Sequence, residues 1–243
     1  SLIKLDAERE KALLAPVGPH AWLPAKPVRA PVVVAMAKPV TGTATKPASR
    51  DAAAERLIKA VCQKLISLEE PLNALDAKAG DGDTGSTVAT GARSILERID
   101  ALPLADRAAT AAAIGDTLGT SMGGSSGVLL SIFFTAASQS LGAGAPLGKA
   151  LLAGLDRMTF YGGAKVGDRT MVDALEPALN VLDASGLEAA AEAARQGAEA
   201  TAAMQKAKAG RSAYIGRQLD TADPGAFAVA EVFAAVAALF APA

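Results

Sequence analysis

The sequence predicts an all-α fold of eight helices that follow an extended linker, and three observations predict it. From Asp51 onward, apolar residues recur with a period close to 3.6, which is the spacing of one helix face. Prolines stand near the expected helix starts, and glycines stand near the expected ends and in turns. After residue 50, no segment is convincing as a strand. The expected helices span residues 51–70, 86–100, 104–120, 125–140, 146–160, 170–184, 187–208 and 224–240.

Composition limits the possible classes of protein. Of the 243 residues, 51% are hydrophobic and only 4% are aromatic, so we expect a sizeable core of Ala, Leu, Val and Ile. The net charge of −1 disfavours nucleic acid as a partner, because phosphate-binding surfaces carry a basic surplus. The longest apolar stretches are too short or interrupted by Glu231, which predicts no membrane span. The single cysteine, Cys62, lies in an amphipathic pattern and is expected to be buried.

The first 48 residues differ in character from the rest. The opening SLIKLDAEREKALLAP indicates a short apolar strand and then a charged helical turn, which is too little to fold alone and lacks the form of a signal peptide. Residues 26–48 are rich in Pro, Val, Thr and Ala without helical periodicity, which is typical of an extended linker. We therefore expect a cytoplasmic protein with three parts, residues 1–25, 26–48 and 49–243.

An acidic, glycine-rich loop interrupts the helical pattern in LNALDAKAGDGDTGST. Asp76, Asp81 and Asp83 stand where glycines allow the backbone to curl, so their carboxylates can converge. Converging carboxylates repel one another unless a cation is present, and their oxygens suit Mg²⁺ or Ca²⁺. An EF-hand is excluded, since its twelfth position would be Ala92. An acidic helix-capping turn is the simpler alternative.

Hydroxyl and glycine residues directly after the acidic loop predict an anion site. They open the next helix, and free N–H groups with hydroxyls at a helix start bind anions. These residues are Thr84, Gly85, Ser86 and Thr87. A cation site beside an anion site is what a metal–phosphate ligand requires.

Three further loops carry similar patterns. In GTSMGGSSGVLL, Gly124, Ser125 and Ser126 precede an apolar helix and can bind an anion, although close helix packing is an equal alternative. YGGAKVGDRTMVDALEPA offers Thr170 and Met171 for contact with a flat ring, with Asp168 or Thr170 as the cap of the next helix and Asp173 in its first turn.

The fourth loop, GRSAYIGRQLDTADPGA, contains Arg211 and Arg217, which can neutralise phosphate. It ends in a turn, Asp223-Pro224-Gly225, that starts the last helix. A plain turn would account for this pattern equally well.

Taken together and in this order, the four loops resemble the nucleotide-binding domain of the dihydroxyacetone (glycerone) kinase family. LDAKAGDGDTGST, MGGSSGVL, GDRTMVDAL and GRSAYIGRQLDTADPGA carry the resemblance, which covers essentially residues 51–243. It implies a DhaL-like barrel of eight antiparallel helices. It also implies that residues 1–25 end a substrate-binding domain and that residues 26–48 are the interdomain linker of the single-chain, ATP-using form.

The resemblance further implies a role for each matching residue. Asp76, Asp81 and Asp83 match the ligands of two Mg²⁺ ions, which bridge the phosphates of ATP or ADP. The remaining positions match the family's phosphate contacts and the wall beside the adenine, and Arg211 matches a neighbour of the phosphates or the ribose. These positions are Thr84, Gly85, Ser86, Thr87, Gly124, Ser125 and Ser126 for phosphate, and Gly162, Thr170, Met171, Asp223, Pro224 and Gly225 for the nucleotide wall and turn.

The acceptor site is not expected in this chain. In the family a histidine of the other domain holds the ketone covalently, and the one histidine here, His20, does not match that motif. We therefore expect no catalytic residue beyond the metal ligands, and a partner domain that carries dihydroxyacetone, glyceraldehyde or erythrulose, with dimers formed by the full-length protein. The alternatives are a phosphotransferase-system subunit that keeps ADP as a cofactor, a related fatty acid kinase domain, and a helical scaffold without nucleotide.

Overall fold

The computed structural model describes residues 6–15, 46–78, 80–204, 207 and 220–241, and it confirms the all-α class. The chain divides into two units, Ser1–Thr43 and Ala44–Ala243. In the first unit, helix α1 (Ala7–Leu14) begins after Asp6, whose Oδ1 accepts a hydrogen bond from Arg9 N at 2.8 Å. The predicted charged helical turn is thus present. The predicted strand and most of the predicted linker lie outside the described residues.

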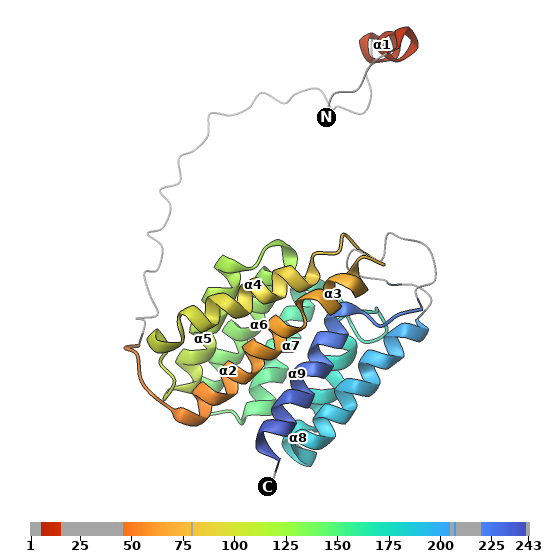
Figure 1. Ribbon diagram of the computed structural model, residues 1–243. Coiled ribbons are helices and arrows are strands. Elements are labelled where there is room, and N and C mark those ends of the chain that lie inside the picture. Colours follow the sequence, from red (N-terminus) through yellow and green to blue (C-terminus); the bar gives the residue numbers. More distant parts are fainter. Residues whose placement is uncertain (1–5, 16–45, 79, 205–206, 208–219, 242–243) are drawn as a thin grey trace. The chain divides into compact units, whose positions relative to one another are not determined.

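The second unit consists of helices that pack against one another (Figure 1). Their bounds are α2 Ala52–Ser67, α3 Glu69–Asp76, α4 Thr84–Glu97, the 3-10 helix η1 Ile99–Ala101, α5 Arg107–Ser121, α6 Gly124–Gly142, α7 Leu147–Gly162, α8 Val172–Ala203 and α9 Pro224–Phe240. Among the described residues there is no strand, only an isolated bridge between Ser49 and Pro103.

The helices of the second unit close into a ring. Following the chain, α2 packs against α4, each helix from α4 to α8 packs against the next, α8 packs against α9, and α9 returns to α2. Helix α8 contains two segments, because Gly186 has φ 82° and ψ −175° and interrupts the helical backbone. With these two segments counted separately, the described residues contribute eight helices to the ring, which is the number that the sequence predicts. The short α3 packs across α4 and α9.

Several predicted boundaries differ from the observed ones by a few residues, and two of them have local reasons. The helix expected over 51–70 ends at Ser67, and Leu68 with φ −90° and ψ 3° separates it from α3. The helix expected from 104 begins at Arg107, because Asp106 accepts a hydrogen bond from Ala109 N at 2.9 Å and caps it. The segment expected to reach 208 ends at Ala203.

Small apolar side chains let the helices approach closely. Between α8 and α9 the buried cluster consists only of alanines. Gly197 allows the two halves of α8 to touch, since a Cβ there would lie 2.1 Å from the carbonyl oxygen of Asp173. Cys62 is buried as predicted, and burial raises the pKa of its thiol to about 12. No helix within the described ranges combines the length and apolar character needed to cross a membrane.

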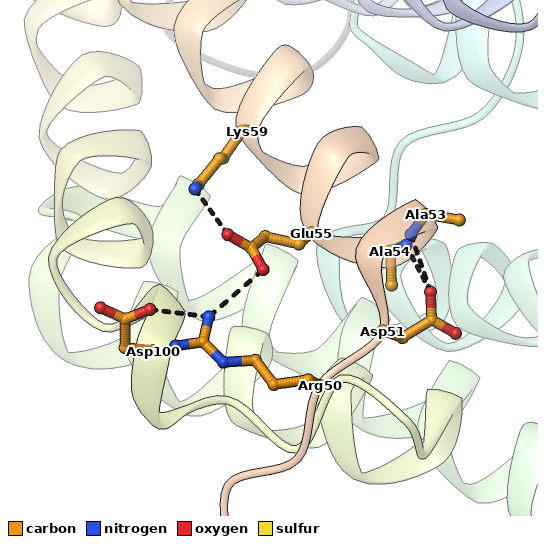
Figure 2. Close-up of polar contacts among 7 residues, drawn as sticks. All are labelled: Arg50, Asp51, Ala53, Ala54, Glu55, Lys59 and Asp100. Carbon is orange, nitrogen blue, oxygen red and sulfur yellow. Dashed lines mark hydrogen bonds and ion pairs between the residues drawn. The ribbon is translucent and has the colours of Figure 1, made fainter.

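Polar contacts fix the start of α2, as Figure 2 shows. Asp51 Oδ1 accepts hydrogen bonds from Ala53 N and Ala54 N, both at 2.9 Å, and so caps the helix. Arg50 forms ion pairs with Asp100 of η1 at 2.9 Å and with Glu55 of α2 at 3.2 Å. These pairs are exposed, so they contribute little stability, but they tie the beginning of the ring to the connection after α4.

Candidate functional site

The three aspartates of the acidic loop converge. One carboxylate oxygen from each of Asp76, Asp81 and Asp83 lies within 4.8 Å of the other two. Asp76 is buried at the end of α3, whereas Asp81 and Asp83 are exposed. Such close carboxylates favour a bound cation, and an all-oxygen donor set fits a hard ion of the Mg²⁺ type. The residues present therefore fit the metal that the sequence predicts.

Asp76 also organises the loop that carries the other two aspartates. Its Oδ2 accepts hydrogen bonds from Gly82 N at 3.1 Å, Asp83 N at 3.0 Å and Thr84 N at 3.2 Å. The glycines are needed for this arrangement. A Cβ at Gly80 would lie 2.2 Å from Asp76 Oδ1, and Gly82 has φ +78°, which favours glycine.

Residues of α3 provide hydrogen-bond partners for part of the start of α4. Ser86 N donates to Asn73 Oδ1 at 3.1 Å, and Asn73 Nδ2 donates to Ser86 Oγ at 3.0 Å. Gly85 lies against α3, since a Cβ there would be 1.9 Å from the carbonyl oxygen of Glu69. Asn73 was not predicted as a site residue, although its position one helical turn before Asp76 places both on the same face of α3.

The start of α6 is more open. Its cap, Gly123, provides no side-chain hydrogen bond, and Gly124, Ser125 and Ser126 are exposed. An uncapped helix start with exposed N–H groups and hydroxyls attracts anions. It lies beside α4, because a Cβ at Gly91 would be 2.6 Å from Cγ of Met122, directly before this loop. Compared with α4, α6 therefore has more backbone donors available for a phosphate.

The third loop and the described end of the fourth loop, residues 220–226, form one wall. Gly162 at the end of α7 faces α6, since a Cβ there would lie 3.2 Å from Leu129 Cδ2. Gly225 faces the third loop, because a Cβ there would be 3.1 Å from Met171 Cβ. Leu129, Ala164 and Met171 are partly buried at the border of one apolar cluster. A flat apolar ring could lie against such a border.

Buried polar residues support this wall. Asp173 accepts hydrogen bonds from Gly167 N at 2.6 Å and Thr170 N at 2.7 Å. Of the two residues that the sequence offers as the cap of α8, Asp168 accepts a hydrogen bond through its Oδ2 from Lys165 N at 3.0 Å, inside the preceding loop. Thr170 Oγ1 accepts from Val172 N, the first residue of α8, at 3.2 Å, although Met171 holds the N-cap position and supplies no side-chain cap.

Asp223 caps α9 from a buried position. Its Oδ1 accepts a hydrogen bond from Ala226 N at 2.9 Å, and the following Pro224 is also buried. Burial raises the pKa of this carboxyl to about 6, although the Ala226 N–H and the Arg169 charge act in the opposite direction. The charge of Asp173 adds to the increase in pKa.

The loops meet at one end of the ring. Leu72, one turn before Asp76, packs in a cluster with Ala228, one turn after Asp223. Figure 1 shows the end of α3, the end of α8 and the start of α9 on the same side of the domain. Arg211 and Arg217 lie outside the described residues. Of the remaining predicted positions, residues 84–87 follow the acidic loop directly, residues 124–126 begin α6 beside α4, and the others lie in the wall beside Met171.

A ring of antiparallel helices with a carboxylate cluster and an open helix start at one end defines a helical domain suited to a metal and an anion. The chain belongs to the DAK2 domain family, whose family model matches residues 78–238. The match includes the acidic loop from Lys78, the start of α6 and the turn that begins α9.

Individual relatives agree with this assignment. The chain is 47% identical to the dihydroxyacetone kinase of Citrobacter freundii over 241 residues, which are 97% of this chain and 44% of that protein. It is 43% identical to the mouse triokinase/FMN cyclase over 190 residues, 72% of this chain and 33% of the relative. The chain thus spans less than half the length of these relatives.

Solved structures also match. The native crystal structure of the C. freundii dihydroxyacetone kinase superposes with a TM-score of 0.76 and 45% identity, covering 98% of this chain and 43% of the kinase. The complex of that kinase with AMP-PNP and Mg²⁺ gives a TM-score of 0.72 and 44% identity, with the same coverage. The fold of this chain therefore matches part of the C. freundii kinase.

Proposed function

We propose that residues 49–243 form the nucleotide-binding, phosphoryl-donating domain of an ATP-dependent kinase for dihydroxyacetone or a related short-chain sugar. One observation carries the proposal: Asp76, Asp81 and Asp83 converge at the end of the ring where α6 presents an uncapped start. Support comes from the related C. freundii kinase, whose solved complex contains AMP-PNP and Mg²⁺. The domain would work in the cytoplasm.

In this proposal the residues divide into three groups. Asp76, Asp81 and Asp83 would hold two Mg²⁺ ions, which neutralise phosphate charge and help orient the transferred phosphoryl group. The starts of α4 and α6 would bind the phosphates through N–H groups and hydroxyls. Met171 and the loop glycines would receive the adenine, with Arg211 near the phosphates or the ribose. The phosphate residues are Thr84, Gly85, Ser86, Thr87, Gly124, Ser125 and Ser126, and the adenine-side residues are Gly162, Thr170, Met171, Asp223, Pro224 and Gly225.

The acceptor would be held elsewhere. The curated relatives, named dihydroxyacetone kinase and triokinase, are more than twice as long as the part that this chain matches. We propose that a substrate-binding domain corresponding to their remaining length supplies the acceptor. Residues 1–25 would be the last segment of that domain, and residues 26–48 would be the linker. The full-length protein would form a homodimer. The identity of the acceptor would then depend on that domain.

Calorimetry on the 243-residue chain tests the proposal. We expect AMP-PNP to bind with Mg²⁺ and much more weakly without it, and Asp81→Asn to lose the Mg²⁺-dependent part. Asp156→Asn, at an exposed position of α7, is the matched control and should bind as the wild type does. Absence of nucleotide binding by the wild type would overturn the proposal. Retention of ADP through purification, without ATP turnover beside an added substrate domain, would instead favour the phosphotransferase-system alternative.

A further inference from the structure

Arg169 is a buried arginine behind the wall formed by the third and fourth loops. It is only 1% exposed, and its Nε donates a hydrogen bond to the carbonyl oxygen of Thr201 at 3.2 Å. Its Nη2 donates to the carbonyl oxygen of Thr221, while Nη1 is buried without a hydrogen-bond partner. A buried donor without a hydrogen bond lowers the stability of the fold, so an arginine is unfavourable at a purely structural position.

The backbone of Arg169 is strained as well. Its φ of +61° is the only positive φ of a non-glycine residue in the part of the chain that the structure describes. For a long side chain this left-handed conformation is unfavourable, and such strain concentrates at functional sites. Thr170 and Met171 follow directly, so the strained residue sets the direction in which they leave the loop.

The side chain of Arg169 connects this segment to the turn on the other side of the wall. Thr221 lies two residues before Asp223, and Gly225 faces Met171. Thr201, the second acceptor, also receives a hydrogen bond on its Oγ1 from Asp223 N at 2.8 Å. One guanidinium therefore links the end of α8 and the approach to α9, and its own backbone leads to Met171.

Resting on the proposed function, we propose that Arg169 is a positioning residue that fixes the spacing between Met171 and the Asp223–Gly225 turn, and thereby sets affinity for the base of the nucleotide. It acts through the wall and does not contact the phosphates. Lysine would not replace it, because a single ammonium lacks the planar fork that reaches two carbonyls in different directions. The charge of Arg169 interacts with the carboxyl of Asp223, which lies in the same wall.

The test compares two ligands that differ by the nucleoside. On the full 243-residue chain with Mg²⁺, we expect Arg169→Lys to weaken AMP-PNP binding by at least about tenfold and to leave tripolyphosphate binding within about twofold. Arg195→Lys is the matched control, since Arg195 lies exposed on α8 and pairs with Glu192 and Glu199. Millimolar guanidinium should restore part of the AMP-PNP affinity of Arg169→Ala.

The other possible results contradict either the positioning role of Arg169 or the proposed function. Equal losses for AMP-PNP and tripolyphosphate, or no loss for either, would overturn the positioning role while leaving the proposed function intact. A wild type that binds neither ligand would overturn the proposed function itself. If Arg169→Lys does not fold, Arg169→Ala with and without guanidinium replaces it, and the same ratio of affinities then decides.

Discussion

Asn73 and Ser86 exchange two hydrogen bonds across 13 residues, with Ser86 N donating to Asn73 Oδ1 at 3.1 Å and Asn73 Nδ2 donating to Ser86 Oγ at 3.0 Å. This reciprocal pair gives α4 a cap supplied by α3, since Asp83 at the N-cap position makes no side-chain capping hydrogen bond. The end of α3 and the start of α4, which flank the acidic loop, are thereby held together.

Removing this pair should cost stability. We expect Asn73→Ala to lower the free energy of unfolding by about 1–2 kcal/mol, because it removes a cap and leaves the Ser86 N–H without its partner. Urea unfolding measures the change. Asn180→Ala, at an exposed position on α8, should stay within about 0.5 kcal/mol of the wild type. Equal effects of the two substitutions would show that the pair does not stabilise the domain.

A methyl group at Gly80 should disturb the metal ligands. A Cβ there would lie 2.2 Å from Asp76 Oδ1, so Gly80→Ala must displace the carboxylate that organises the loop. We expect Mg²⁺ affinity, measured by calorimetry with AMP-PNP present, to fall by roughly 10- to 100-fold. For Gly142→Ala, the nearest atom would be Ala108 Cβ at 3.9 Å, and we expect no change. Unaltered affinity in Gly80→Ala would exclude Asp76 from the metal site.

The helices were largely predictable because their signals are local. The bounds of α9 agree with the prediction, since Asp223 and Pro224 mark its start in the sequence itself. The break at Leu68 was missed because the apolar period continues through it. Its one signal was Pro71, which is tolerated in the first turn of a helix but disfavours a helix that continues from α2.

The site was predictable only where it is local in sequence. Asp76 ends α3, and Asp81 and Asp83 lie in the glycine-rich loop directly after it, so their convergence follows from short-range geometry. Arg169, by contrast, finds its partners 32 and 52 residues away, and the pairing depends on how α8 and α9 pack. A single sequence gives no sign of such contacts, and a lone arginine is ordinarily read as exposed.

A second long-range cap joins α8 to α7. Asp183 accepts hydrogen bonds from Gly148 N at 2.9 Å and Lys149 N at 3.0 Å, at a helix start where Pro146 provides no side-chain cap. We expect Asp183→Ala to lower the free energy of unfolding by about 1 kcal/mol. The carboxylate accepts hydrogen bonds from free N–H groups at the helix start and interacts favourably with the helix dipole, and the alanine loses both interactions. Thermal unfolding compared with Asp156→Ala, an exposed aspartate of α7 itself, measures it. A change no larger than the control would contradict the cap.

The buried Asp223 should make stability depend on pH. Burial raises the pKa of its carboxyl from 3.8 to about 6, and the charge of Asp173 adds to this increase. The Ala226 N–H and the charge of Arg169 lower the pKa but do not outweigh the burial. Between these values the carboxyl is ionised in the unfolded chain and protonated in the folded one. The folded state then binds more protons, so a rise in pH favours unfolding. The contribution of Asp223 to stability is therefore fully present below pH 3.8 and is lost as pH rises through about 6.

Asp223→Asn isolates this effect, because an asparagine keeps the cap of α9 but cannot ionise. We expect the stability difference, wild type minus variant, to fall by on the order of 1–3 kcal/mol between pH 4 and pH 7. Denaturant unfolding at several pH values measures that difference and cancels the titration of other groups. A difference that stays constant over this range would mean that Asp223 ionises alike in both states, and a rising difference would mean that Arg169 and the Ala226 N–H outweigh its burial.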